Sequence, residues 1–232
     1  MDKRYSRQTL FKPIGNQGQK NIEKTVVTVI GCGALGSSIV ETLVRAGVGE
    51  IHLVDRDYVE LSNLQRQQLF TEVDAAQMLP KVTAAEKRLK AIREDVRLYT
   101  YLDNLDAQLI EKLASASTLI MDATDNFETR LLINDAAVKH RVPWIYGACV
   151  GSSGVMFPFV PGESACFRCL IPVLPAINET CDTAGIISPA VQITAALQCA
   201  EAIKWLSGNK EAMRKKVHHF NLWENTQLDI GI

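Results

Sequence analysis

Short apolar runs rich in β-branched residues alternate with helically periodic segments up to Gly147. We predict buried strands at these runs because they are too short for helices. They cover residues 25–30, 51–54, 96–101, 118–121 and 143–146. One helical pattern follows a glycine-rich turn and extends to Arg45. Three others cover residues 81–93, 106–114 and 127–140. This alternation predicts βαβ units and hence a doubly wound, mainly parallel sheet of the Rossmann-like α/β class.

The pattern changes after Gly147. Residues 151–160 are predicted to return as a hairpin strand, and residues 217–223 and 226–230 to form terminal strands. A long helix is expected over residues 189–206 before Gly208. The proline-rich stretch 172–183 has no periodicity and is predicted to be a mobile loop. The sequence has no internal repeat, so we expect one continuous domain whose parallel sheet has a C-terminal antiparallel extension.

The composition is that of a soluble globular protein: the 232 residues are 47% hydrophobic and 22% charged, with a formal net charge of −1. The absence of excess positive charge argues against nucleic-acid and membrane partners. No apolar run approaches the ~20 residues of a membrane span, and the basic N-terminus has no apolar stretch behind it. We therefore expect a cytoplasmic protein with reduced thiols, in which Cys32 and Cys199 are core residues.

The first chemical motif is a glycine-rich turn that joins a predicted strand to a helix. It contains Gly31, Gly33 and Gly36, and Asp55 follows at the end of the next strand. Glycines let the backbone approach a nucleotide, and the helix N-terminus favours phosphates. A carboxylate in the place of Asp55 can bind ribose hydroxyls. The motif predicts a nucleotide site without choosing between NAD, S-adenosylmethionine and ATP.

The segment after Asp55 favours ATP. Asp57, Asn63 and Arg66 lie between strand and helix, at the carboxyl edge of the sheet where ligands bind, and Lys81 begins the next helix. An arginine and a lysine directed at one pocket suit a triphosphate, because they can neutralise the charge on leaving pyrophosphate. The alternative is a solvated charged loop.

Two further carboxylates, Asp122 and Asp125, follow the predicted strand at 118–121. Carboxylates at this edge can hold Mg²⁺ on the phosphates, and Asp125 is the stronger candidate. Asp122 can instead hydrogen-bond the turn. Asp125 or its neighbour Asn126 can instead cap the next helix.

Together these motifs resemble the ThiF, MoeB and HesA family of adenylyltransferases, bacterial relatives of ubiquitin-activating enzymes. The resemblance covers nearly the whole chain and rests on YSRQ, GCGALG, DRDYVELSNLQRQ, the helix at Lys81 and DATDNFETRLLIND. It implies that a ubiquitin-like sulfur carrier is adenylated by ATP on its C-terminal glycine carboxylate. We favour a ThiS-like carrier of thiamine biosynthesis; a MoaD-like carrier of molybdopterin biosynthesis is the alternative.

The resemblance also implies residue roles. The glycines would lie beneath the nucleotide, Asp55 would hold the ribose, and Asp125 would bind Mg²⁺. The expected phosphate contacts are Asn63, Arg66 and Lys81, and Asp57 and Asn126 complete the nucleotide-binding set. Arg7, in YSRQ, matches an arginine that reaches the neighbouring subunit's site, which implies a homodimer. Residues of about 20–150 would form the nucleotide-binding half and residues 151–232 the carrier-binding half.

Cys166 and Cys169 have the spacing of half a zinc site. The family usually completes it with a second CxxC near the C-terminus, and this sequence contains none. Cys181, His218 and His219 are possible substitutes that nothing in their context favours. We expect zinc in a parent protein that extends to the second pair rather than in this chain.

Cys181 lies within the predicted loop and matches a cysteine that, in ThiF-type enzymes, can form an acyl-disulfide with the carrier after sulfur transfer. A loop thiol can reach the adenylate and remain accessible to a sulfur donor such as a cysteine desulfurase.

Three rival functions remain. A nicotinamide-dependent dehydrogenase explains the glycines and Asp55, but leaves Arg66, Lys81 and Asp125 without a purpose. A tRNA-modifying relative that uses ATP is closer, and the near-neutral charge argues against it. A protein-binding scaffold would need an incomplete phosphate-contacting set, whereas the set in this sequence is complete.

Overall fold

A computed structural model describes residues 3–170 and 185–231 of the chain. One eight-stranded sheet has the order β3-β2-β1-β4-β5-β6-β7-β8. Strands β1 to β5 are parallel where they pair, and β5 to β8 are successively antiparallel. The strands are β1 Val26–Ile30, β2 Glu50–Val54, β3 Arg97–Tyr101, β4 Leu119–Asp122, β5 Trp144–Val150, β6 Ser153–Phe159, β7 Val217–Asn221 and β8 Thr226–Ile230. The predicted fold class and its antiparallel extension are confirmed.

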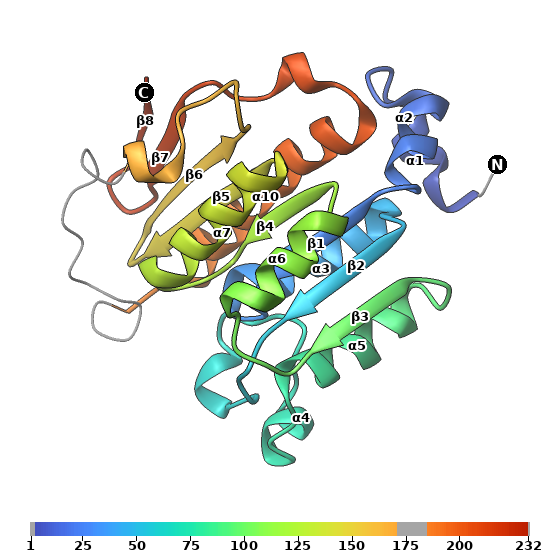
Figure 1. The fold of residues 1–232 in the computed structure, drawn as a ribbon. Coiled ribbons are helices and arrows are strands. Elements are labelled where there is room, and N and C mark those ends of the chain that lie inside the picture. Colours follow the sequence, from blue (N-terminus) through green and yellow to red (C-terminus); the bar gives the residue numbers. More distant parts are fainter. Residues whose placement is uncertain (1–2, 171–184, 232) are drawn as a thin grey trace.

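Helices cover both faces of the sheet (Figure 1). On one face α3 packs on β1 and α5 on β3, while α10 contacts α2, α3, β5 and β6. On the other face α7 packs on β4, β5, α6 and α8. The helices are α1 Ser6–Thr9, α2 Gly15–Ile22, α3 Ala34–Ala46, α4 Glu72–Ala76, α5 Lys81–Ile92, α6 Ala107–Ala116, α7 Phe127–His140, α8 Phe167–Leu170 and α10 Ser188–Ser207, with 3-10 turns η1 Lys3–Tyr5, η2 Leu61–Asn63 and η4 Lys210–Ala212.

Two apolar cores result, one on each face of the sheet. Val27 and Val29 of β1 join the core beneath α3 and α10, whereas Ile30 joins the core beneath α6 and α7. The alternation follows from the period of two along a strand. Side chains of β1, β2 and β4 pack into both cores. This packing fixes the positions of the strand ends that lead into the glycine turn and the neighbouring loops.

Helices α1, α2 and α4 are not evident from the apolar pattern, because each is short and half exposed. Long-range polar contacts hold α2 in place. Gln19 is buried and donates to Ala46 O at 3.2 Å, and Asn21 donates to Ser207 O, the last residue of α10, at 3.1 Å. Tertiary packing decides such elements more than local propensity does.

The thiols of Cys32 and Cys199 are buried, as predicted for core residues. Burial raises the pKa of Cys199 to about 12 and also raises the pKa of Cys32. The predicted loop at 172–183, with Cys181, lies outside the described residues. No helix in the described ranges is long and apolar enough to cross a membrane.

Candidate functional site

The three glycines of the turn between β1 and α3 have different structural roles. Gly31 has φ +94°, and a Cβ there would lie 2.5 Å from Ala123 O in the loop after β4. A Cβ on Gly36 would overlap Gly31 O, so this glycine lets α3 pack against the turn. Beside Gly33 the space is open, with Gln67 Nε2 nearest at 3.8 Å. Gly33 is also the N-cap of α3 and has no side-chain cap, so the first helical N–H groups are available to an anion.

Asp55 ties this turn to the end of β2. Its Oδ2 accepts a hydrogen bond from Cys32 N at 2.6 Å, and its Oδ1 accepts one from Asp57 N at 2.7 Å. Burial raises the pKa of Asp55, while the positive charge of Lys81 and the two N–H groups act in the opposite direction. Each oxygen keeps a lone pair, so the carboxylate can still accept ribose hydroxyls as predicted.

Lys81 is buried, and its ammonium group lies beside the same turn. Nζ is 2.9 Å from Asp57 Oδ2, and only 9% of the Lys81 side chain is exposed. The backbone is tied as well, because Lys81 N donates to Asp57 O at 2.9 Å. The sequence placed both residues at the site, and the structure adds that they form an ion pair.

Asn63 and Arg66 hold the segment between β2 and α4. Asn63 Oδ1 accepts from Glu60 N at 3.2 Å and closes the 3-10 turn η2. Arg66 is half-buried and donates from Nη1 to Ser62 O at 3.0 Å. Both side chains therefore have a local structural role, and their phosphate contacts stay predictions.

Asp122 is fully buried and has a structural role. Its Oδ1 accepts from Thr124 N at 2.9 Å and Thr124 Oγ1 at 2.6 Å. Its Oδ2 lies 3.2 Å from Nε of Arg130, whose guanidinium is 5.6 and 5.2 Å from the ring centroids of Phe127 and Tyr146. Burial raises the pKa of Asp122, opposed by Arg130 and Thr124. The alternative in which Asp122 hydrogen-bonds the turn is the one the structure shows.

Asp125 is exposed at the rim of the same loop. Its Oδ1 accepts from Asn126 Nδ2 at 3.1 Å, and Asn126 caps α7 by accepting from Thr129 N at 2.9 Å. The helix-cap alternative is thus correct for Asn126, whose nucleotide contact stays a prediction. No group of three or more His, Cys, Asp and Glu residues that could hold a metal occurs in the described ranges. A single exposed carboxylate fits Mg²⁺, which takes its other ligands from phosphate and water.

Two buried glutamines were missed from the sequence. Gln67 faces Gly33 of the turn, and Gln198 of α10 lies beneath the ends of β4 and β5. The Oε1 atom of each is buried without a hydrogen-bond partner in the described structure. Gln67 belongs to the polar segment DRDYVELSNLQRQ and could have been singled out with it. Gln198 lies in an apolar helix, and no local signal marks it.

Cys166 and Cys169 lie at α8, with their Sγ atoms 3.6 Å apart. Burial raises the pKa of the Cys166 thiol, but hydrogen bonds from the backbone and side chain of Cys169 outweigh it, so the pKa is lowered overall. Arg7 is exposed on α1, and within the described residues its side chain makes no hydrogen bond or ion pair. Among the described residues, the contacts of the glycine turn given above include none of these three side chains.

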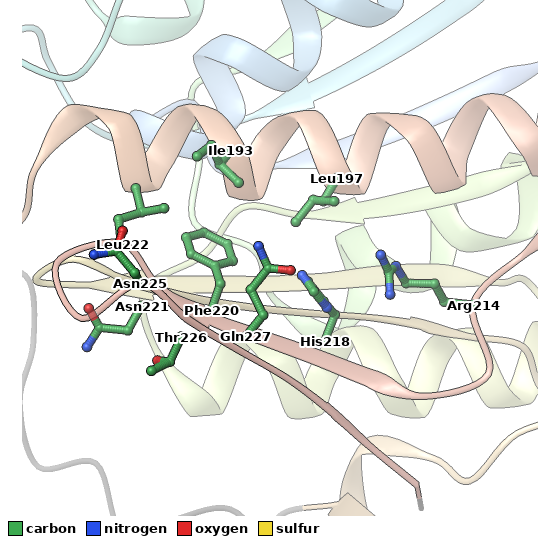
Figure 2. A pocket seen from close by; sticks show the side chains of 10 residues that line it. All are labelled: Ile193, Leu197, Arg214, His218, Phe220, Asn221, Leu222, Asn225, Thr226 and Gln227. Carbon is green, nitrogen blue, oxygen red and sulfur yellow. The ribbon is translucent and has the colours of Figure 1, made fainter.

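A separate pocket of about 350 Å³ lies between α10 and the β7–β8 hairpin (Figure 2). Ile193 and Leu197 line it from the helix, and Figure 2 shows polar side chains of the hairpin on the other side. The hairpin also exposes Trp223, Leu228 and Ile230. None of the predicted nucleotide-binding residues lines this pocket.

Comparison with known proteins gives one family. A model described as the ThiF family matches residues 5–230. The sulfur carrier protein ThiS adenylyltransferase of Bacillus subtilis (strain 168) is 50% identical over 230 residues, 99% of this chain and 68% of the relative. The enzyme with the same description in Escherichia coli (strain K12) is 38% identical over 206 residues, 88% of this chain and 81% of the relative. The crystal structure of E. coli MccB with ATP matches with a TM-score of 0.86 at 23% identity, over 100% of this chain and 71% of that chain, and so supports the fold.

Proposed function

Because this chain belongs to the ThiF family, we propose that it is an ATP-dependent adenylyltransferase that activates the C-terminal glycine carboxylate of a ThiS-like sulfur-carrier protein. The observation that carries the proposal is the assembly of the glycine turn, Asp55 and the buried Lys81 at one carboxyl edge of the sheet. Both relatives described above are named as enzymes of this activity. The dehydrogenase alternative leaves Lys81 without a purpose there.

In the proposed reaction, a carboxylate oxygen of the carrier attacks the α-phosphorus of ATP. A new oxygen–phosphorus bond forms, the bond to the β-phosphate oxygen breaks, and pyrophosphate leaves with the bonding electron pair. The carboxylate is already ionised at neutral pH, so no general base is needed. Catalysis then consists of positioning and charge stabilisation. The open face at Gly33 and the uncapped start of α3 would receive phosphate, while Lys81 and Arg66 would offset the charge on the leaving group.

Two metals belong to the proposal. Asp125 would hold Mg²⁺, which when bound offsets phosphate charge and orients the triphosphate. In a parent protein that carries a second CxxC, Cys166 and Cys169 would supply two of the four ligands of a structural zinc ion. Their close thiols and the lowered pKa of Cys166 suit a metal ligand pair, and zinc stays a prediction.

We propose a homodimer in which Arg7 reaches the partner's nucleotide site. The exposed guanidinium on α1, with no hydrogen bond or ion pair in the described part of its own chain, supports this role. The carrier would bind the half formed by residues 151–232. The pocket beside α10 and the apolar side chains exposed on the β7–β8 hairpin are consistent with a protein partner there.

The proposal is tested by ATP–pyrophosphate exchange with purified carriers. We expect exchange that depends on a ThiS-like carrier and disappears when its terminal glycine is removed. A MoaD-like carrier in parallel tests the alternative substrate. No exchange with any carrier would contradict the enzyme assignment.

Replacing Cys181 by serine separates adenylation from the step that follows. We expect Cys181→Ser to retain ATP–pyrophosphate exchange within about twofold, because adenylation needs no thiol, and to reduce sulfur transfer to the carrier. Cys149→Ser is the control for loss of another thiol. Unaltered sulfur transfer in Cys181→Ser would show that this cysteine has no covalent role.

A further inference from the structure

Gln198 connects α10 to the strands that end at the proposed nucleotide site. Its side chain is fully buried, and Nε2 donates to Asp122 O at 2.8 Å and to Ile145 O at 3.1 Å. These carbonyls belong to the neighbouring strands β4 and β5, which lie 76 and 53 residues before Gln198 in the sequence. A single amide thus joins one helix to two strand ends.

The bridge lies where the sheet itself stops connecting the two strands. The parallel pairing of β4 with β5 ends at Met121 and Ile145. The two N–H groups of the Gln198 amide then hold the carbonyls at the end of the ladder together. Gly147 of β5 leaves the space that this requires, because a Cβ there would overlap the Gln198 amide and has no nearer neighbour.

Packing alone does not account for a glutamine at this position. Oε1 of Gln198 is buried without a partner in the described structure, and an unpaired buried acceptor is unfavourable. Methionine has a similar length and would bring no unpaired amide oxygen of its own into the core. What glutamine offers beyond methionine is the pair of donated hydrogen bonds.

Asp122 O is the last carbonyl before the loop that carries Asp125. Ala123 N donates to Ile30 O at 2.9 Å, and Ala123 O lies against the face of Gly31. Arg130 Nη2 donates to Thr124 O at 2.6 Å. The loop is therefore fixed by β1 and by α7, and Gln198 supplies its connection to α10.

We propose that Gln198 is a positioning residue for the nucleotide site: it fixes the ends of β4 and β5 and thereby sets the loop at 123–126 against the glycine turn. The inference rests on the proposed function, because it assigns MgATP to this loop. Gln198 itself contacts backbone carbonyls and not the substrate.

The test uses Gln198→Met in the full-length chain, with Thr194→Val as the matched control. Thr194 is equally buried on α10 and donates to Ala190 O at 2.9 Å, against β6 rather than β4. We expect Gln198→Met to raise the Kd for MgATP, measured by calorimetry without carrier, about tenfold. The KM for the carrier should stay within about twofold, and the control should change neither value. A wild-type Kd in Gln198→Met would overturn the inference.

A second pair of variants separates positioning from packing and serves if Gln198→Met does not fold. Gly147→Ala displaces the amide, so it should lower the melting temperature and weaken MgATP binding. Adding Gln198→Ala removes the overlap and should recover part of the melting temperature but not the Kd. Recovery of the wild-type Kd in the double variant would show that only packing is at stake. If the wild type binds MgATP but catalyses no exchange, the proposed function fails, while these Kd comparisons still decide the role of Gln198.

Discussion

Asp125→Asn is expected to lower kcat for carrier-dependent ATP–pyrophosphate exchange at least about a hundredfold, because it removes the charge proposed to hold Mg²⁺ on the phosphates. The melting temperature should stay within about 2 °C of wild type, since the side chain is exposed and accepts a hydrogen bond from the adjacent Asn126. Exchange assays over a range of Mg²⁺ concentrations, with thermal unfolding in parallel, measure both quantities.

Glu128→Gln is the matched control for this change. Glu128 is exposed in the first turn of α7, three positions after Asp125, and the substitution removes the same charge. Exchange by Glu128→Gln should stay within about threefold of wild type, as expected for a screened surface charge. Full activity of Asp125→Asn at every Mg²⁺ concentration would exclude Asp125 as the metal ligand.

The alternation of strands and helices and the glycine turn follow from patterns that are local in sequence. A short apolar run of β-branched residues marks β1, and the glycines mark the start of α3. Because the strands are parallel, the turn, Asp55 and the loop after β4 lie at the same carboxyl edge of the sheet. These parts of the fold and the site could therefore be predicted before any contact was known.

Burial decides what the sequence left open. Asp122 and Asp125 are the same residue type at the same strand end, and only the structure shows that Arg130 neutralises one while the other faces solvent. Gln198 is beyond local prediction, because its role depends on how α10 crosses two distant strands. The ion pair of Lys81 with Asp57 likewise requires the return of the chain after α4.

Asp122→Asn is expected to lower the free energy of unfolding by about 3–5 kcal/mol, because it leaves the buried guanidinium of Arg130 without its counter-charge. For a chain of this size the melting temperature should fall by about 10 °C. The amide keeps an oxygen to accept from Thr124, so the loss reports mainly on the ion pair. Urea unfolding at neutral pH measures the free energy directly.

Asp135→Asn provides the control, because Asp135 also pairs with an arginine, Arg168, but both side chains are about half exposed. Its unfolding free energy should stay near that of wild type, since water screens such a pair. The double variant Asp122→Asn with Arg130→Met should recover part of the loss, because it removes the uncompensated charge together with its partner. Equal losses for Asp122→Asn and Asp135→Asn would mean that Arg130 finds another partner, and Asp122 would then lose its structural role in holding the loop beside Asp125.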